Sequence, residues 1–245
     1  MIQAHNFKPT PIFFVTDTEK KFNEKINEFI GIELEIIGED KYTCAYELSN
    51  DNFFYCKNDM SIGSSGIEIV SHPASINYHV NSGKWKKVYE ILDKTRMYNN
   101  EGCGLHFHVN KNGFTNESLS VLDYFVNNNQ KMMEAFGDRN FGFYCRARNK
   151  RCSDWGKREI SEHCDSVNFS NENTVELRFF NSPTEYKVFL QKLFIVKNII
   201  LFVKQTSFKD IYYKNNIDLF IEYLDKNGFE ESPYIKLFLK NNKII

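Results

Sequence analysis

Several features of common protein classes are absent from this 245-residue sequence. Its 31 lysine and arginine residues nearly balance its 32 aspartate and glutamate residues, so the formal net charge is −1. No overall positive field therefore favours nucleic acid or an anionic membrane as a partner. The longest apolar stretch, residues 188–203, predicts a core helix rather than a membrane span, because it is interrupted by Gln191, Lys192, Lys197 and Asn198.

The cysteines also lack a familiar pattern. Six are present, but no two have the C-x2-C spacing of a zinc ribbon. The first ten residues, MIQAHNFKPT, contain no apolar segment of the kind found in secretory signals. Without export, reduced thiols and a cytoplasmic location are the expectation.

The chain has no internal repeat and no low-complexity linker. Hydrophobic residues make up 42% of it and aromatic residues 16%, which is enough for a substantial core. The predicted strands and helices do not follow one another in a regular strand–helix–strand order. We therefore expect an α+β fold with a mainly antiparallel, curved sheet, whose polar concave face carries the active site and whose other face is covered by helices.

The pattern predicts three parts: an N-terminal arm over residues 1–28, a catalytic domain over 29–205, and a helical extension over 206–245 packed on the same domain. The expected strands are 29–37, a hairpin of 42–48 and 53–57, 67–70, 102–110 and 174–180. The expected helices are 83–98, 115–136, one that starts with Ser182 as its cap, 217–226 and 233–239.

Three strands far apart in the sequence each carry two polar side chains around one apolar residue. They are Glu33-Leu34-Glu35, His106-Phe107-His108 and Glu176-Leu177-Arg178. In a strand, residues i and i+2 point to the same face and the residue between them points to the other. If the three strands are neighbours, carboxylates, imidazoles and a guanidinium share one face. This combination is typical of a metal-and-phosphate site and indicates an enzyme.

Glu33 and Glu35 would repel each other on an apolar strand unless a divalent cation lies between them. Glu68, among β-branched residues, is a candidate third carboxylate. The alternative for all three is a strand face exposed to water, with solvated acids. Asp59, just before a Ser/Gly turn, either joins the site or caps the turn.

The two histidines follow the turn Gly102-Cys103-Gly104. Histidines on one face are common metal ligands, whereas a single core histidine usually bonds a backbone carbonyl. Cys103 with His106 and His108 could instead hold zinc.

Glu176 and Arg178 predict either a simple salt bridge or a metal ligand beside a phosphate-binding guanidinium. A run of basic residues precedes them: Arg146, Arg148, Lys150, Arg151, Lys157 and Arg158. This run is either a loop that closes on nucleotide phosphates or a solvated loop; nucleic-acid binding ranks behind both.

Four motifs in this order resemble the amidoligases related to glutamine synthetase and glutamate–cysteine ligase, enzymes that join a carboxylate to an amine using ATP. The motifs lie at residues 31–35, 59–71, 102–108 and 174–180, and the resemblance spans roughly residues 29–205. It implies a glutamine-synthetase-like fold. Glu101 stands where the synthetase has Asn, so the resemblance does not extend to glutamate as the substrate.

The resemblance also implies a role for each matched residue. The metal ligands would be Glu33, Glu35, Glu68, His106 and Glu176. The nucleotide would be bound by His108, Arg146, Arg148, Lys157, Arg158 and Arg178, of which Arg178, Arg146 and Lys157 would act in catalysis. The substrate would lie near Gly102, Gly104 and Asp59.

The implied cofactors are ATP and two or three Mg²⁺ or Mn²⁺ ions, and the implied reaction forms an amide through an acyl phosphate. The partners would be small-molecule or peptide carboxylates and amines, and an oligomer is compatible with this interpretation. Two alternatives from other classes stay open: a phosphotransferase on a related fold, and a catalytically inactive binding protein derived from it.

Overall fold

The computed structural model describes residues 1–245 except 23–25, 27, 144, 149–153, 159–160 and 228–230. The chain divides into two compact units. Unit 1 contains Met1–Asn110 and Asn181–Leu190, and unit 2 contains Lys111–Phe180 and Gln191–Ile245. Helices and strands are mixed along the chain, so the expected α+β class is confirmed.

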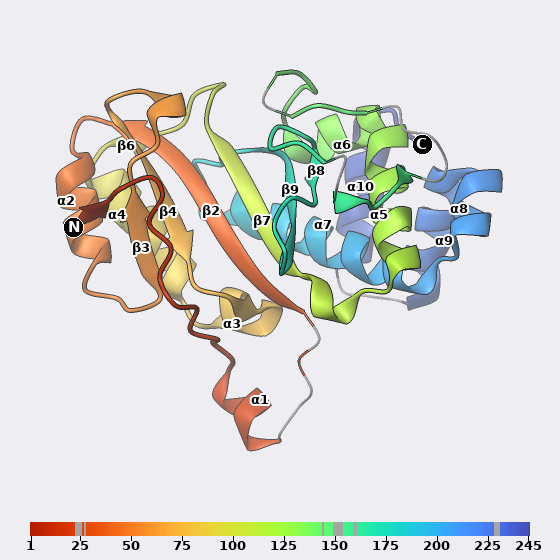
Figure 1. The fold of residues 1–245 in the computed structure, drawn as a ribbon, viewed down its shortest axis with the longest axis horizontal. Coiled ribbons are helices and arrows are strands. Elements are labelled where there is room, and N and C mark those ends of the chain that lie inside the picture. Colours follow the sequence, from red (N-terminus) through yellow and green to blue (C-terminus); the bar gives the residue numbers. More distant parts are fainter. Residues whose placement is uncertain (23–25, 27, 144, 149–153, 159–160, 228–230) are drawn as a thin grey trace. The chain divides into compact units, whose positions relative to one another are not determined.

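The sheet of unit 1 is built around its longest strand, β2 (Phe29–Gly38), which is orange in Figure 1. Its neighbours are β4 (Gly66–Ser71) on one side and β7 (Gly104–Asn110) on the other, and both run antiparallel to it. The remaining strands are β3 (Phe54–Lys57) beside β4, β1 (Ile2–Gln3) parallel to β3, and the short β5 (Ala74–Ser75) and β6 (Met97–Tyr98), which pair with β2. The sheet is thus mainly antiparallel, as expected.

Alternation along β2 separates an apolar face from a polar one. Ile30, Ile32, Leu34 and Ile36 are at most 1% exposed, and they point to the face opposite Glu33 and Glu35. Burial of such side chains stabilises each by about 1.5–3 kcal/mol. The apolar layer therefore fixes the register that places the two glutamates on the other face.

Helices of unit 1 pack on the apolar face. They include α3 (Ile76–Asn81) and α4 (Lys84–Lys94), and the start of α7 (Tyr186–Gln205) joins them. The Trp85 ring of α4 lies 5.0 Å from Phe54 and 4.5 Å from Phe189, measured between ring centroids. Two shorter helices complete the unit: α1 (Asp17–Lys21) and α2 (Lys41–Leu48).

The N-terminal arm is held to the sheet at two places. Ile2 and Gln3 pair with Cys56 and Lys57 of β3, and Phe14 bridges to Ala74. The arm, dark red in Figure 1, runs from β1 to α1. Its position is therefore set by backbone hydrogen bonds at both ends.

Unit 2 contains α5 (Asn116–Asn128), α6 (Gln130–Gly137) and the antiparallel pair β8 (Val167–Asn168) and β9 (Thr174–Asn181). Its C-terminal helices are α8 (Phe208–Tyr213), α9 (Asn216–Asn227) and α10 (Ser232–Asn241). The rings of Phe125, Phe202 and Phe220 contact one another in the core, with centroids 5.0–5.5 Å apart. Thr115 caps the start of helix α5 and forms a capping box with Ser118.

Four sequence predictions were wrong in detail. The expected single helix over 115–136 is two helices, α5 and α6, which are separated at Asn129. The expected first hairpin strand, residues 42–48, lies in helix α2, whose start is capped by Asp40. Helix α4 ends at Lys94, and Met97–Tyr98 pair with β2 instead. Ser182 does not cap α7: its hydroxyl donates to the Glu35 carbonyl at 2.6 Å, and the helix begins at Tyr186.

The expected helices at 217–226 and 233–239 are confirmed as α9 and α10, whereas α8 was not predicted. In the part of the chain that the structure describes, no helix has both the length and the apolar character required to traverse a bilayer.

Candidate functional site

The register of three strands gathers the predicted polar residues of unit 1 on one face of its sheet. Glu33 lies directly opposite His106, and Glu35 directly opposite Glu68. His108 lies opposite Gly31, the residue two positions before Glu33. Residues paired in this way share a face, so the sequence prediction of a common polar surface is confirmed for β2, β4 and β7.

Glu33 lies at the centre of this surface. Its carboxylate oxygens lie 3.3 Å from His108 Nε2, 3.8 Å from His106 Nδ1 and 3.7 Å from Lys57 Nζ. Burial alone would raise the pKa of Glu33, but the His108 charge and hydrogen bonds from His106 and His108 hold it well below its usual range. Glu33 is therefore held as a carboxylate, the form that binds cations.

Glu35 is positioned by the glycine turn before the histidines. Its Oε2 accepts a hydrogen bond of 2.6 Å from the Gly104 N–H, and its Oε1 lies 3.9 Å from His106 Nδ1. Gly104, a predicted substrate residue, thus uses its N–H to orient a predicted metal ligand. Gly102 lies in the turn itself, where its N–H donates to Asn100 Oδ1 at 2.9 Å.

Glu68 and Lys57 form a close ion pair of 2.9 Å on the neighbouring strands β4 and β3. Burial and the nearby charge of Glu33 raise the pKa of Glu68 well above its usual range, and Lys57 offsets this only in part. Burial opposes the charge of Lys57, yet the two glutamates raise the pKa of Lys57. A lysine ammonium therefore supplies the positive charge on this surface.

The composition of this surface fits divalent cations. Glu35, Glu68 and His106 are at most 5% exposed, and Glu33 is half-buried. Burial and the charge of Glu33 disfavour ionisation of Glu68 while no cation is bound, and a divalent cation would favour the carboxylate form of all three glutamates. Carboxylate oxygens are the donors that Mg²⁺ and Mn²⁺ prefer in proteins, and imidazole nitrogens suit Zn²⁺ and other transition metals.

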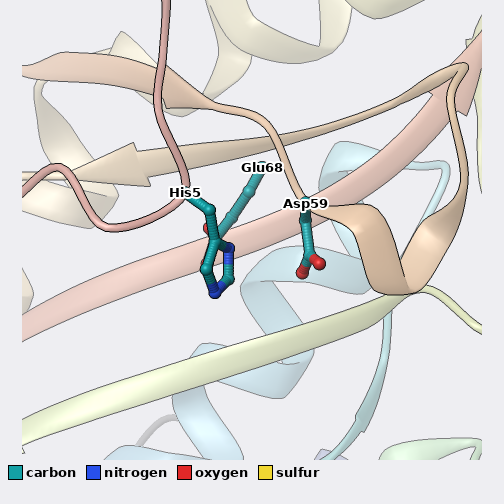
Figure 2. Close-up of side chains that lie close together, drawn as sticks. All are labelled: His5, Asp59 and Glu68. Carbon is teal, nitrogen blue, oxygen red and sulfur yellow. The ribbon is translucent and has the colours of Figure 1, made fainter.

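Asp59 lies beyond the end of β3. Its Oδ1 accepts a hydrogen bond of 2.8 Å from the Ser61 N–H, which caps the short 3-10 helix Met60–Ile62. Possible ligand atoms of His5, Asp59 and Glu68 all lie within 4.8 Å of one another (Figure 2). Asp59 thus lies near Glu68, one of the predicted metal ligands.

Glu176 and Arg178 lie in unit 2 and form a buried pair on β9. Arg178 NH1 donates to Glu176 Oε1 at 2.5 Å, and Asn168 Nδ2 of β8 donates to Glu176 Oε2 at 2.8 Å. The two side chains share a face, as the i, i+2 spacing predicts. Asn168 is a further polar neighbour, which the sequence analysis did not single out.

The basic residues before β9 are accompanied by acidic groups. Arg146 pairs with Glu162 at 2.5 Å, and Arg148 pairs with Glu162 and, at 3.0 Å, with Asp165. Lys157 lies 3.4 Å from Asp154, and Arg158 Nε donates to the Ser170 carbonyl at 3.0 Å. Lys150 and Arg151 lie outside the described residues. A phosphate role for this run stays a prediction.

The sequence analysis missed two residues of the unit 1 surface. Lys57 belongs to an expected strand, but only the register between β3 and β4 brings it opposite Glu68. His5 lies in the arm, where no sequence pattern connects it to residues more than fifty positions away. Pairing between distant strands provides the information that single-strand periodicity lacks.

No protein-family model matches the chain, and no curated protein matches its sequence significantly. Among solved structures, the chain is similar to glutamine synthetase from Plasmodium falciparum, at 13% identity and a TM-score of 0.47. The match covers 92% of this chain and 73% of that chain. This is a distant similarity of backbone arrangement.

Proposed function

We propose that this protein is an ATP-dependent carboxylate–amine ligase that forms an amide or peptide-like bond through an acyl phosphate. The observation that supports the proposal is the convergence of Glu33, Glu35 and Glu68 with His106 and His108 on one sheet face. The chemical reason is that a divalent cation makes such a concentration of buried carboxylates favourable, and nucleotide chemistry requires such cations.

The reaction needs activation of the carboxylate because oxide is a poor leaving group. The substrate carboxylate oxygen attacks the γ-phosphorus of ATP, which gives an acyl phosphate and ADP. The amine nitrogen then attacks the acyl carbon, the C–O bond to phosphate breaks, and the nitrogen loses a proton. Phosphoryl transfer depends on positioning and charge neutralisation, so no nucleophilic side chain of the protein is required.

In this proposal Glu33, Glu35, Glu68 and His106 hold divalent ions, and Glu176 of unit 2 is a further proposed metal ligand. Bound Mg²⁺ or Mn²⁺ would neutralise the phosphate oxygens during transfer. His108 faces the nucleotide, and Lys57 keeps Glu68 in place. Arg178, with Arg146, Arg148, Lys157 and Arg158, would contact phosphate groups.

The substrate side of the proposal involves the glycine turn. The Gly104 N–H orients Glu35, so Gly104 would shape the site through that glutamate. Gly102 lies at the exposed part of the turn and Asp59 beyond the end of β3, where a small or peptide substrate could reach both. We propose a cytoplasmic enzyme that acts on such carboxylates and amines.

The test is ATP turnover by the purified protein with Mg²⁺ and a panel of carboxylic acids and amines. ADP, phosphate and the amide product are measured together, because a ligase forms them in equal amounts. The double variant Glu33→Gln with Glu35→Gln should lose turnover. The control variant Glu90→Gln, at an exposed position of α4, should retain it. Phosphate release that persists in the double variant would contradict the proposal, and a phosphorylated acceptor without amide would indicate a phosphotransferase.

A further inference from the structure

We propose that His5 of the N-terminal arm, together with Asp59 and Glu68, forms a second divalent-cation site that ties the arm to the sheet. The three residues come from three separate segments of unit 1: the arm, the turn after β3, and strand β4. Their possible ligand atoms all lie within 4.8 Å of one another. Figure 2 shows the Glu68 side chain extending toward the His5 ring, with the Asp59 carboxylate on the other side.

The spacing of the three side chains is close to the spacing of ligands around a bound ion. Ligand atoms lie about 2.0–2.2 Å from zinc, so two ligands of one tetrahedral ion are roughly 3.3–3.6 Å apart. The three groups lie within 4.8 Å of one another, so they need to approach by no more than about 1.5 Å to reach that spacing. His5 is exposed, so rotation of its side chain can supply most of that movement, while the buried Glu68 stays in place.

The backbone already brings His5 to this position. Ile2 and Gln3, which precede His5 by three and two residues, pair with β3. The Gln3 carbonyl also accepts a hydrogen bond of 3.0 Å from the Asn58 N–H. Asn58 is the neighbour of Asp59, so the same contact fixes both ligands relative to each other. Asp59 is further oriented by the Ser61 N–H at 2.8 Å. A site held in this way loses little entropy when it binds an ion.

The donor set indicates the class of ion. One imidazole nitrogen with two carboxylates suits Mn²⁺ or Zn²⁺ better than Mg²⁺ or Ca²⁺, which prefer oxygen donors alone. Three protein ligands leave at least one coordination position for water or a substrate group. The Asp59 and Glu68 carboxylates both oppose the charge of a divalent ion, and Lys57 contacts the Glu68 carboxylate at 2.9 Å.

Glu68 connects this site to the polar surface around Glu33 and Glu35. It lies directly opposite Glu35 and also belongs to the cluster with His5. The second site shares Glu68 with the proposed ligase site but requires neither ATP nor catalysis. Its consequence is structural: an ion there adds a third attachment of the arm to the sheet, at His5, between the backbone pairings of β1 and of Phe14.

The test is a titration of metal-stripped protein with Mn²⁺ and, separately, with Zn²⁺. Calorimetry measures the binding, and no nucleotide is present. We compare the wild type with His5→Ala and with the matched control His163→Ala, which removes an exposed imidazole outside the cluster. Removal of ligands or of their supporting groups weakens metal sites by about 10–100-fold or more. In His5→Ala the affinity for one of the bound ions should therefore fall by at least about 10-fold, while His163→Ala should bind ions like the wild type.

Hydrogen exchange measured by mass spectrometry gives a second readout. Zn²⁺ should slow exchange of the amides of residues 4–8 in the wild type and in His163→Ala, but not in His5→Ala. Identical titrations and identical exchange in His5→Ala and His163→Ala would overturn the inference. The ligase proposal fails separately: a protein without ATP turnover that still shows the His5-dependent binding event retains the second site.

Discussion

Glu35 and Glu68 lie directly opposite each other on the antiparallel strands β2 and β4, and both are buried. Like charges in such a cross-strand pair destabilise a sheet. Lys57 contacts Glu68, but the surface also carries Glu33. An arrangement that lowers the stability of the ligand-free protein is typical of a functional site.

Glu68→Gln should stabilise the cation-free protein and abolish its stabilisation by cations. The substitution keeps the shape of the side chain but supplies a neutral group, so the cost of burying the Glu68 charge, or of protonating it, disappears. We expect a gain of up to about 1 kcal/mol in the free energy of unfolding, or about 2–4 °C for a chain of this size. Thermal unfolding with EDTA and with 1 mM Mn²⁺ measures both effects, with Glu90→Gln as the control. A variant that is less stable in EDTA yet still stabilised by Mn²⁺ would contradict this interpretation.

The sequence predicted this surface well because strand alternation is a local property. Glu33 and Glu35 share a face whatever their neighbours are, and Leu34 between them is completely buried, as expected. The sequence could not show that Glu68 lies opposite Glu35 rather than one residue further along. Register depends on packing between strands, and a shift by one residue would turn Glu68 to the other face.

Because His79 is buried, we expect the protein to lose stability in mild acid. Its Nε2–H donates to the Ile30 carbonyl and its Nδ1 accepts from Trp85, and burial lowers the pKa of His79 to about 4. The unfolded chain binds this proton near pH 6.5. The contribution of neutral His79 to the stability of the fold is therefore fully present above about pH 6.5, and it is lost as the pH falls toward 4.

Urea unfolding at pH 7 and pH 5 measures this effect. The wild type should lose about 2 kcal/mol through His79 between these values. His79→Gln should be less stable at pH 7 but should lose correspondingly less on acidification, while the exposed His163→Gln should behave like the wild type. Equal pH dependence in wild type and His79→Gln would show that His79 is not buried in its neutral form.

Three cysteines should be inert in the native protein. Burial raises the pKa of Cys44, Cys56 and Cys145 to about 12, so at pH 8 only about one thiol in ten thousand is ionised. Iodoacetamide should leave all three unmodified, whereas the same reaction in urea should label them, as read by peptide mass spectrometry. Native labelling of Cys56 at the rate seen in urea would show that strand β3 does not pack as described.

Gly137→Ala should destabilise unit 2. A Cβ at this position would lie 1.7 Å from the Phe179 carbonyl oxygen, so α6 would have to move away from β9, the strand that carries Glu176 and Arg178. We expect a cost of about 1–3 kcal/mol or more, measured by urea unfolding. Gly142→Ala is the control, because no described atom lies within 4 Å of a Cβ there. Equal stability of the two variants would contradict the close approach of α6 to β9.

The missed elements have a common cause. Residues 42–48 alternate like a strand, but Asp40 caps the first turn of a helix there, and tertiary contacts of its buried Cys44 and Leu48 stabilise it. Ser182 has the sequence context of a helix cap, yet its hydroxyl bonds the Glu35 carbonyl in another segment. In both cases a partner distant in sequence outweighs the local preference.

The proposed ligase requires Glu33 and Glu35 to hold divalent cations on the polar face of the unit 1 sheet. Electron paramagnetic resonance of free Mn²⁺ during a titration of the metal-stripped protein measures this binding. The wild type should bind at least one ion that the double variant Glu33→Gln with Glu35→Gln does not bind, while the ion dependent on His5 remains in both. Binding of the same number of ions with the same affinity by both proteins would contradict the claim.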